Sequence, residues 1–174
     1  KAIPSPSNGY HSDIAMNPYT SKWVKIDLGK QYRIDTIRIA PARPTDFPDT
    51  PGFGFPLRFK VEKPPIAKGA APTIIRNYTD NDFDNPGDHA VIINGNGEYC
   101  DSIVITATKL WKRTNDYVFA LGEVQVFSGG KNVALGQPVT ASDSIESGRW
   151  SRRFLVDGFD SREQVEVPNA TVNM

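Results

Sequence analysis

The sequence has 174 residues, enough for one domain with a substantial hydrophobic core or for one domain and part of another. Twenty basic and twenty acidic side chains give a formal net charge of zero, which removes the electrostatic case for nucleic acid or an anionic membrane surface as the main partner. No apolar run approaches the roughly 20 residues of a membrane helix. The lone cysteine, Cys100, excludes an internal disulfide and a cysteine-based zinc site.

Apolar residues recur with a period of two through most of the chain, and long amphipathic helical patterns are missing. In chain order, the apolar and β-branched runs cover residues 23–29, 34–40, 57–62, 90–94, 103–108 and 121–127. The first run ends at Gly29, and residues 30–32 indicate a turn. Six short strands with turn signals between them predict an all-β protein built as an antiparallel β-sandwich.

The segments between these strands are long, and they contain many aromatic and polar side chains. They cover residues 8–19, 41–56, 79–89 and 109–117. Long loops in a compact domain are usually functional or disordered, and the aromatic residues argue against plain disorder. We therefore expect the function to reside in these loops.

The chain changes character at Gly129-Gly130. We predict a β-sandwich over residues 1–130, and two alternatives for residues 131–174. They are either the start of a second, similar unit in a tandem array, or a strand segment that folds back and completes the first domain. The chain starts at a lysine in a Pro/Ser-rich stretch, and we expect it to be a piece excised from a larger protein.

Three stretches, taken in order, carry a family resemblance. They are the early strand at residues 23–29 (Trp-Val-Lys-Ile-Asp-Leu-Gly), a late strand at residues 99–107 and a closing strand at residues 121–127. Together they resemble the discoidin family, also called coagulation-factor C-type domains, and the related family 32 carbohydrate-binding modules. The late strand departs from the family because it lacks the arginines that usually flank an aromatic residue. The resemblance implies a galactose-binding-like jelly roll.

The order of the motifs is unusual. Residues 132–142 look like the start motif of the family, and residues 155–158 look like the Asp-Gly turn that follows it. In the family this start precedes the strand that residues 23–29 match, whereas here it comes last. If the terminal segment supplies the missing early strand, the chain is a circular permutation of the family pattern.

A sugar site needs an aromatic platform for the C–H faces and bidentate polar groups for the hydroxyls. The candidate ligand-binding residues are Trp111, Arg113, Asp116 and Tyr117 in the richest cluster, Arg43 and Asp46 in a second, and His11 in a third. The alternative for each aromatic residue is a loop anchor packed on the edge of the sandwich. A further basic and aromatic group spans residues 149–153; it suits a carboxylate or an acidic sugar, although a partner-facing or inter-domain surface is the favoured interpretation.

The resemblance also implies a structural calcium site. It would use loop carbonyls, an aspartate near the Asp-Gly turn and the acidic residue of the closing strand, here Asp157 or Asp160 and Glu123. These side chains meet only if the terminal segment folds back. The acidic run at residues 80–84 has alternating oxygens that suit calcium, but it fails as an EF-hand, and a solvated acidic turn is the favoured interpretation.

No catalytic motif is evident. Neither His11 nor His89 stands in a nucleophile or metal motif, and the sequence has no phosphate loop, nucleophile elbow or zinc signature. We therefore expect the chain itself to be non-catalytic.

These observations predict a carbohydrate-binding accessory module of a larger polysaccharide-degrading enzyme, a glycoside hydrolase by fold-level analogy. The expected partners are a glycan or oligosaccharide and the other domains of the parent chain, without nucleic acid and without membrane insertion. The expected location is secreted, periplasmic or at the cell surface. The alternative is a structural or protein-interaction β-sandwich without a sugar site.

Overall fold

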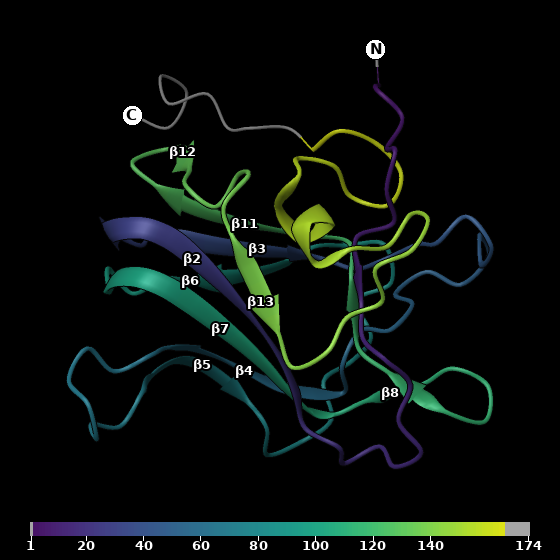
Figure 1. Ribbon diagram of the computed structural model, residues 1–174, viewed down its shortest axis with the longest axis horizontal. Helices are drawn as coiled ribbons and strands as arrows, with labels where there is room; N and C mark the ends of the chain where they lie inside the picture. The colour runs from purple at the N-terminus through teal and green to yellow at the C-terminus, as the bar shows by residue number, and fades with distance from the viewer. Residues whose placement is uncertain (1, 166–174) are drawn as a thin grey trace.

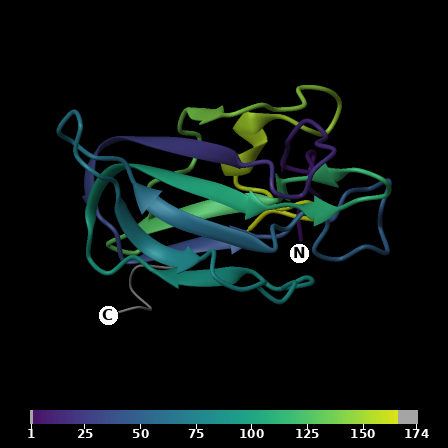
Figure 2. The ribbon, with the colours of Figure 1, turned by 90° about the horizontal axis from the view of Figure 1, so that it is seen from below.

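The computed structural model describes residues 2–165, which form a two-layer β-sandwich (Figures 1 and 2). Its elements are β1 (Tyr10–His11), β2 (Lys22–Arg33), β3 (Thr36–Ala40), β4 (Arg58–Lys63), β5 (Thr73–Tyr78), β6 (Val91–Asn94), β7 (Tyr99–Lys109), β8 (Trp111–Lys112), β9 (Tyr117–Val118), β10 (Ala120–Leu121), β11 (Glu123–Ser128), β12 (Lys131–Asn132), β13 (Val139–Ala141) and the short 3-10 helix η1 (Arg152–Val156). One sheet has the order β13-β2-β7-β4-β5, and the other has the order β12-β11-β3-β6. The pairings are antiparallel, so the predicted all-β antiparallel sandwich is confirmed.

The core lies between the sheets because the inward positions of each strand are apolar. Val24 and Ile26 of β2 lie opposite Ile105 and Ile103 of β7, and all four side chains are at most 1% exposed. Burying each such side chain contributes roughly 1.5–3 kcal/mol. Within residues 2–165, no helix has the length and the hydropathy that a membrane crossing requires.

The turn predicted at residues 30–32 is wrong, because β2 continues to Arg33. The chain instead makes an irregularity inside the strand, where the pairing with β7 shifts register between Asp27 and Tyr32. Gly29 adopts a φ of 85°, and its N–H donates to Oδ1 of Asp27 at 2.9 Å. The glycine therefore marks a bulge and not a strand end.

The terminal segment lies on this same sandwich. Val139 and Ala141 of β13 pair with Ile26 and Val24, and β12 pairs with β11. The segment also meets the start of the chain, where the N–H of Ser5 donates to the carbonyl of Arg162 at 2.7 Å. Within residues 131–165, β12 and β13 thus belong to the sheets of this sandwich, and residues 166–174 of the predicted terminal unit lie outside the described residues.

This coverage explains an unusual strand. The first five residues of β11 are all buried, including both alternating faces. One face looks into the sandwich, and η1 also contacts the strand. Because neither face of this strand is open to solvent, its polar residues Glu123 and Gln125 are buried together with its apolar residues.

The loops gather at one end of the sandwich. Figures 1 and 2 both place the loop of residues 41–56 and the β8–β9 hairpin at that end, close to the N-terminal stretch. The loop that follows β13 is anchored there by Lys22, which is 4% exposed. Its Nζ donates to Oδ2 of Asp143 at 2.6 Å and to the carbonyl of Asp13 at 2.9 Å. This buried ammonium holds three segments together.

We expect Lys22→Met to lower the free energy of unfolding by about 1–3 kcal/mol, because it leaves Asp143 and the Asp13 carbonyl without their charged donor. Chemical denaturation measures this value. Lys25→Met is the matched control on the same strand, and its expected change is within about 0.5 kcal/mol. Equal effects of the two substitutions would contradict the anchoring role of Lys22.

Candidate functional site

An aromatic cluster occupies the loop end of the sandwich. Phe53 lies at its centre, with ring centroids 4.9 Å from Trp111 and 5.1 Å from Phe47. His11 packs edge-on against Trp150 at 4.8 Å. Phe53 is 1% exposed, whereas Phe47, Trp111 and Trp150 are half-buried and form the outer layer. The cluster therefore offers partly exposed rings on a rigid base.

A pair of glycines places Phe53 in the cluster. Gly52 and Gly54 both have a positive φ, 76° and 73°. A Cβ at Gly54 would lie 2.4 Å from the Cβ of Ala120, and the carbonyl of Gly54 accepts the N–H of Ala120 at 2.9 Å. This tight turn holds the Phe53 ring inside the cluster, and only glycine is accommodated at position 54.

His11 belongs to this cluster as a neutral ring. Its side chain is buried, and burial lowers its pKa below the ordinary value of 6.5, against the opposing effect of the Ser12 carbonyl, which lies 2.6 Å from Nδ1. The charges of Arg113 and Asp46 lie close enough to influence it. Structure therefore places His11 beside the predicted loop residues, but as a packing group beneath the surface.

The Arg113–Asp116 pair closes the β8–β9 hairpin. Nε of Arg113 donates to Oδ1 of Asp116 at 3.0 Å, and Nη2 donates to Oδ2 at 2.7 Å. Donation from Arg113 is also the main cause that lowers the pKa of Asp116. Both groups are thus committed to each other, and a ligand that uses either group has to open this fork.

The other predicted residues of this end have different surroundings. Arg43 donates to the carbonyl of Pro48 at 2.7 Å and to Oδ2 of Asp88 at 3.1 Å. Asp46 is exposed, and Tyr117 is half-buried against the main core. The structure thus brings Trp111, Arg113, Asp116 and His11 to one cluster, with Arg43, Asp46 and Tyr117 around its margin. Whether they bind a ligand stays a prediction.

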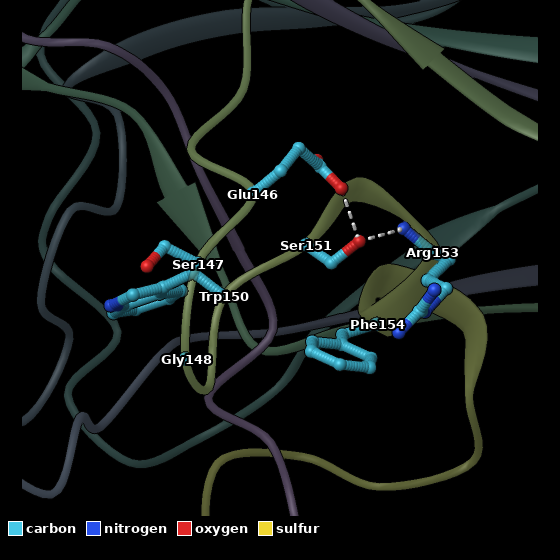
Figure 3. A pocket seen from close by; sticks show the side chains of 7 residues that line it. All are labelled: Glu146, Ser147, Gly148, Trp150, Ser151, Arg153 and Phe154. Atoms are coloured by element: carbon cyan, nitrogen blue, oxygen red, sulfur yellow. Dashed lines mark hydrogen bonds between the residues drawn. The ribbon is translucent and has the colours of Figure 1, made fainter.

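A pocket of about 260 Å³ opens beside this cluster, on the flank of Trp150 (Figure 3). It is lined by Glu146, Ser147, Gly148, Trp150, Ser151, Arg153 and Phe154. In Figure 3 the indole of Trp150 stands on one side, and Phe154 with Arg153 stands on the other. Trp150 belongs to the predicted partner-facing surface at residues 149–153, and nothing in its local sequence indicates that it meets His11.

A hairpin and a capped turn shape the pocket. Ser147 and Trp150 exchange backbone hydrogen bonds at 3.1 Å, and Gly148 turns the chain between them with a φ of 59°. Oγ of Ser151 accepts the N–H of Arg153 at 3.3 Å and donates to Oε1 of Glu146 at 2.6 Å. These bonds fix the pocket wall before any ligand arrives.

The acidic residues of the expected calcium site lie where the terminal segment meets β11 and the start of the chain. Oε2 of Glu123 accepts the N–H of Gly158 at 2.7 Å, and Asp157 accepts the hydroxyl of Ser7 at 2.8 Å. Burial raises the pKa of Glu123 to about 11, and the charge of Asp157 adds to the rise. Asp160 contributes more weakly to that rise, and its Oδ1 accepts two backbone N–H groups.

These residues fit a cation, on one observation. Oε1 of Glu123 is buried, and within residues 2–165 it has no hydrogen-bond partner. The carboxyl groups of buried Glu123 and half-buried Asp157 disfavour each other's ionisation, and a divalent cation would remove that cost. The described residues contain no group of three or more acidic, histidine or cysteine side chains at metal-binding spacing, so loop carbonyls would have to supply further ligands. The calcium site stays a prediction.

Several solved structures are similar to this chain. No family model matches the chain, and no curated protein matches it. CBM32-3 from a family 31 glycoside hydrolase from Clostridium perfringens is 19% identical over 68% of this chain and 73% of that chain, with a TM-score of 0.47. CpGH89CBM32-6, produced by the same organism, is 17% identical over 62% of this chain and 69% of that chain, with a TM-score of 0.41.

Chitosan-binding module 1, derived from a chitosanase/glucanase from Paenibacillus sp. IK-5, is a third similar structure. It is 11% identical over 66% of this chain and 74% of that chain, with a TM-score of 0.45. The two clostridial modules carry the CBM32 designation.

The depressed pKa of His11 predicts a loss of stability in mild acid. The folded protein holds His11 neutral while the unfolded chain protonates near pH 6.5, so the unfolded state binds more protons and the free energy of unfolding falls as the pH drops below that value. We expect His11→Phe, which keeps the ring, to reduce this loss in denaturation curves between about pH 7.5 and pH 5.

Calcium is expected to raise the midpoint of thermal unfolding by about 5 °C or more relative to a chelator. Glu123→Gln should abolish this shift and still fold, because glutamine mimics the protonated carboxyl. Asp84→Asn, in the acidic run of residues 80–84, should retain the shift. A calcium response that disappears with Asp84→Asn and survives Glu123→Gln would place the ion at the other motif.

Proposed function

We propose that this chain is a non-catalytic carbohydrate-binding module and that a sugar ring lies in the pocket between Trp150 and Phe154. The observation that carries the proposal is a pocket of about 260 Å³ whose lining combines two aromatic side chains, Trp150 and Phe154, with polar side chains. A pyranose has apolar C–H faces and a belt of hydroxyls, so it needs both kinds of surface in one place.

The surroundings of the pocket support this function. Trp150 is held from behind by His11, at 4.8 Å, and by Phe53, whose ring centroid is 6.2 Å away. A ring fixed in this way loses little conformational entropy when a ligand stacks on it. Trp111, in the β8–β9 hairpin, also lies against Phe53, with ring centroids 4.9 Å apart, so the aromatic surface extends beyond the pocket. An oligosaccharide longer than one ring would follow that surface.

A carbohydrate-binding module has a role when it is attached to an enzyme. Non-catalytic binding is useful when it raises the local concentration of an attached enzyme on an insoluble or repetitive substrate. We place the chain as an accessory module of a larger polysaccharide-degrading enzyme, in a secreted, periplasmic or surface-bound setting. Support for this role comes from the sequence resemblance and not from the pocket.

Trp150→Ala is expected to weaken sugar binding at least about tenfold, because it removes the larger stacking surface. Titration with a panel of mono- and oligosaccharides, followed by NMR chemical shifts, measures the affinity. Trp23→Ala is the control, since Trp23 is 37% exposed on β2 and should not affect binding.

Trp150 also packs on the aromatic cluster, so its removal will lower stability. Phe154→Ala provides a second test, because among residues 2–165 its ring contacts only the guanidinium of Arg153 as an aromatic or cation partner. It should weaken binding and leave the unfolding midpoint nearly unchanged. If neither variant changes the affinity for any sugar that binds, the site lies elsewhere. No binding at millimolar concentrations to the whole panel would favour a structural or protein-interaction domain.

A further inference from the structure

The charges around the Trp150 pocket are unbalanced, and this imbalance bears on the kind of sugar. Glu146 and Arg153 are the charged residues that line the pocket. Glu146 is neutralised from outside by Arg152, whose Nε lies 3.3 Å from Oε2. The negative charge at the pocket is therefore already paired within the protein.

Glu146 also has little capacity left to accept bonds from a ligand. Partial burial opposes its ionisation, but donation from Ser144, Ser151 and Arg152 prevails and lowers its pKa to about 2. Oε1 accepts the Ser151 hydroxyl at 2.6 Å, and Oε2 accepts the Ser144 hydroxyl at 2.5 Å and the backbone N–H of Arg152 at 2.8 Å. This carboxylate is a permanently ionised structural group and not a free acceptor for sugar hydroxyls.

Arg153 has the opposite status. Its guanidinium lies 5.0 Å from the centroid of the Phe154 ring and, within residues 2–165, it forms no ion pair. Figure 3 shows its side chain beside Phe154, across the pocket from Trp150. The exposed side chain thus presents a fork of N–H donors at the pocket edge, with the flat face supported by an aromatic ring.

Arg149 adds a second uncompensated charge nearby. Its Nε donates to Oδ1 of Asn8 at 2.9 Å, and its Nη2 donates to the carbonyls of Ser5 and Ser7 at 3.1 and 3.0 Å. All three acceptors are neutral, so the positive charge is satisfied by dipoles and not cancelled. The pocket lining itself carries one basic and one acidic side chain, Arg153 and Glu146, and Arg149 and Arg152 flank it in the sequence.

We propose that the Trp150 pocket selects a sugar that carries an anionic group, a uronic acid carboxylate or a sugar sulfate, and that Arg153 is the residue that recognises the anion. The inference rests on the proposed carbohydrate function. The ring of the sugar lies between Trp150 and Phe154, and its anionic oxygens accept from the guanidinium of Arg153 in bidentate geometry. Arg149 contributes a favourable potential without a direct bond.

The test compares matched ligands by NMR titration of the whole chain: glucuronic acid, galacturonic acid, galactose 6-sulfate, glucose and galactose. We expect the anionic sugars to bind about tenfold more tightly than the neutral ones, the size of a charge-assisted hydrogen bond at an exposed site. The preference should shrink when the salt concentration rises from about 0.05 M to 0.5 M, because exposed charges are screened. Comparing the uronic acids with the sulfated sugar identifies which anion the pocket takes.

Arg153→Gln should remove the preference while binding of neutral sugars persists. Arg153→Lys should restore part of it, since the charge returns without the planar fork. The matched control is Arg76→Gln, because Arg76 is also exposed and stacked on a ring, 4.9 Å from the centroid of Tyr78, and its loss changes the net charge equally. This control should keep the preference.

The outcomes separate two failures. Equal affinity for anionic and neutral sugars in the unmodified chain, or a preference that survives Arg153→Gln, overturns the inference and leaves the carbohydrate function standing. Absence of binding to every sugar, at low and at high salt, overturns the carbohydrate function itself and the inference with it.

Discussion

The short pairing between β13 and β2 is the constraint on which the loop end of this protein depends. Three residues, Val139–Ala141, add an edge to the five-stranded sheet, and two residues later Asp143 receives the buried ammonium of Lys22. From that point the chain crosses the loop end, where it forms the pocket. The same segment then brings Asp157 beside Glu123. A pairing of three residues thus positions both the pocket wall and the acidic pair.

Polar groups at the loop end fall into two kinds, and the difference decides what each can do. Arg113 and Asp116 satisfy each other inside a hairpin, and Glu146 is saturated by hydroxyl and backbone donors. These groups define the shape of the site. The guanidinium of Arg153 lies over the Phe154 ring, and among the described residues it forms no ion pair with a carboxylate. Its N–H donors therefore remain available to a ligand. Charged residues that look alike in a sequence therefore have opposite roles.

Alternation of apolar residues was a sound guide to the fold, because in β2 the apolar residues Val24, Ile26 and Leu28 are buried while the residues between them are exposed or half-buried. The alternation pattern did not predict β5, which is an edge strand that exposes Ile74 and buries Ile75. Only one residue of this strand is buried, so its sequence shows no alternation. The contact between His11 and Trp150 joins distant parts of the chain, and no local pattern encodes it.

Phe53 was missed for a related reason. The signal was present as glycines on both sides of one aromatic residue, a pattern that forces a side chain out of a tight turn. Its meaning depends on Ala120, which lies against Gly54 and fixes where the ring points. Sequence reasoning selected residues of the right loops, but the assembly of those loops into one cluster required the fold.

The Trp150 ring packs on the interior residues His11 and Phe53, and the same residue lines the pocket. Ligand preference is therefore open to adjustment from the interior. If the pocket binds a sugar as proposed, a substitution at His11 or Phe53, neither of which lines the pocket, would tilt the indole and change which sugars fit. Diversification of such a module need not pass through its contact surface, and a survey restricted to pocket-lining positions would overlook the mutations that retune it.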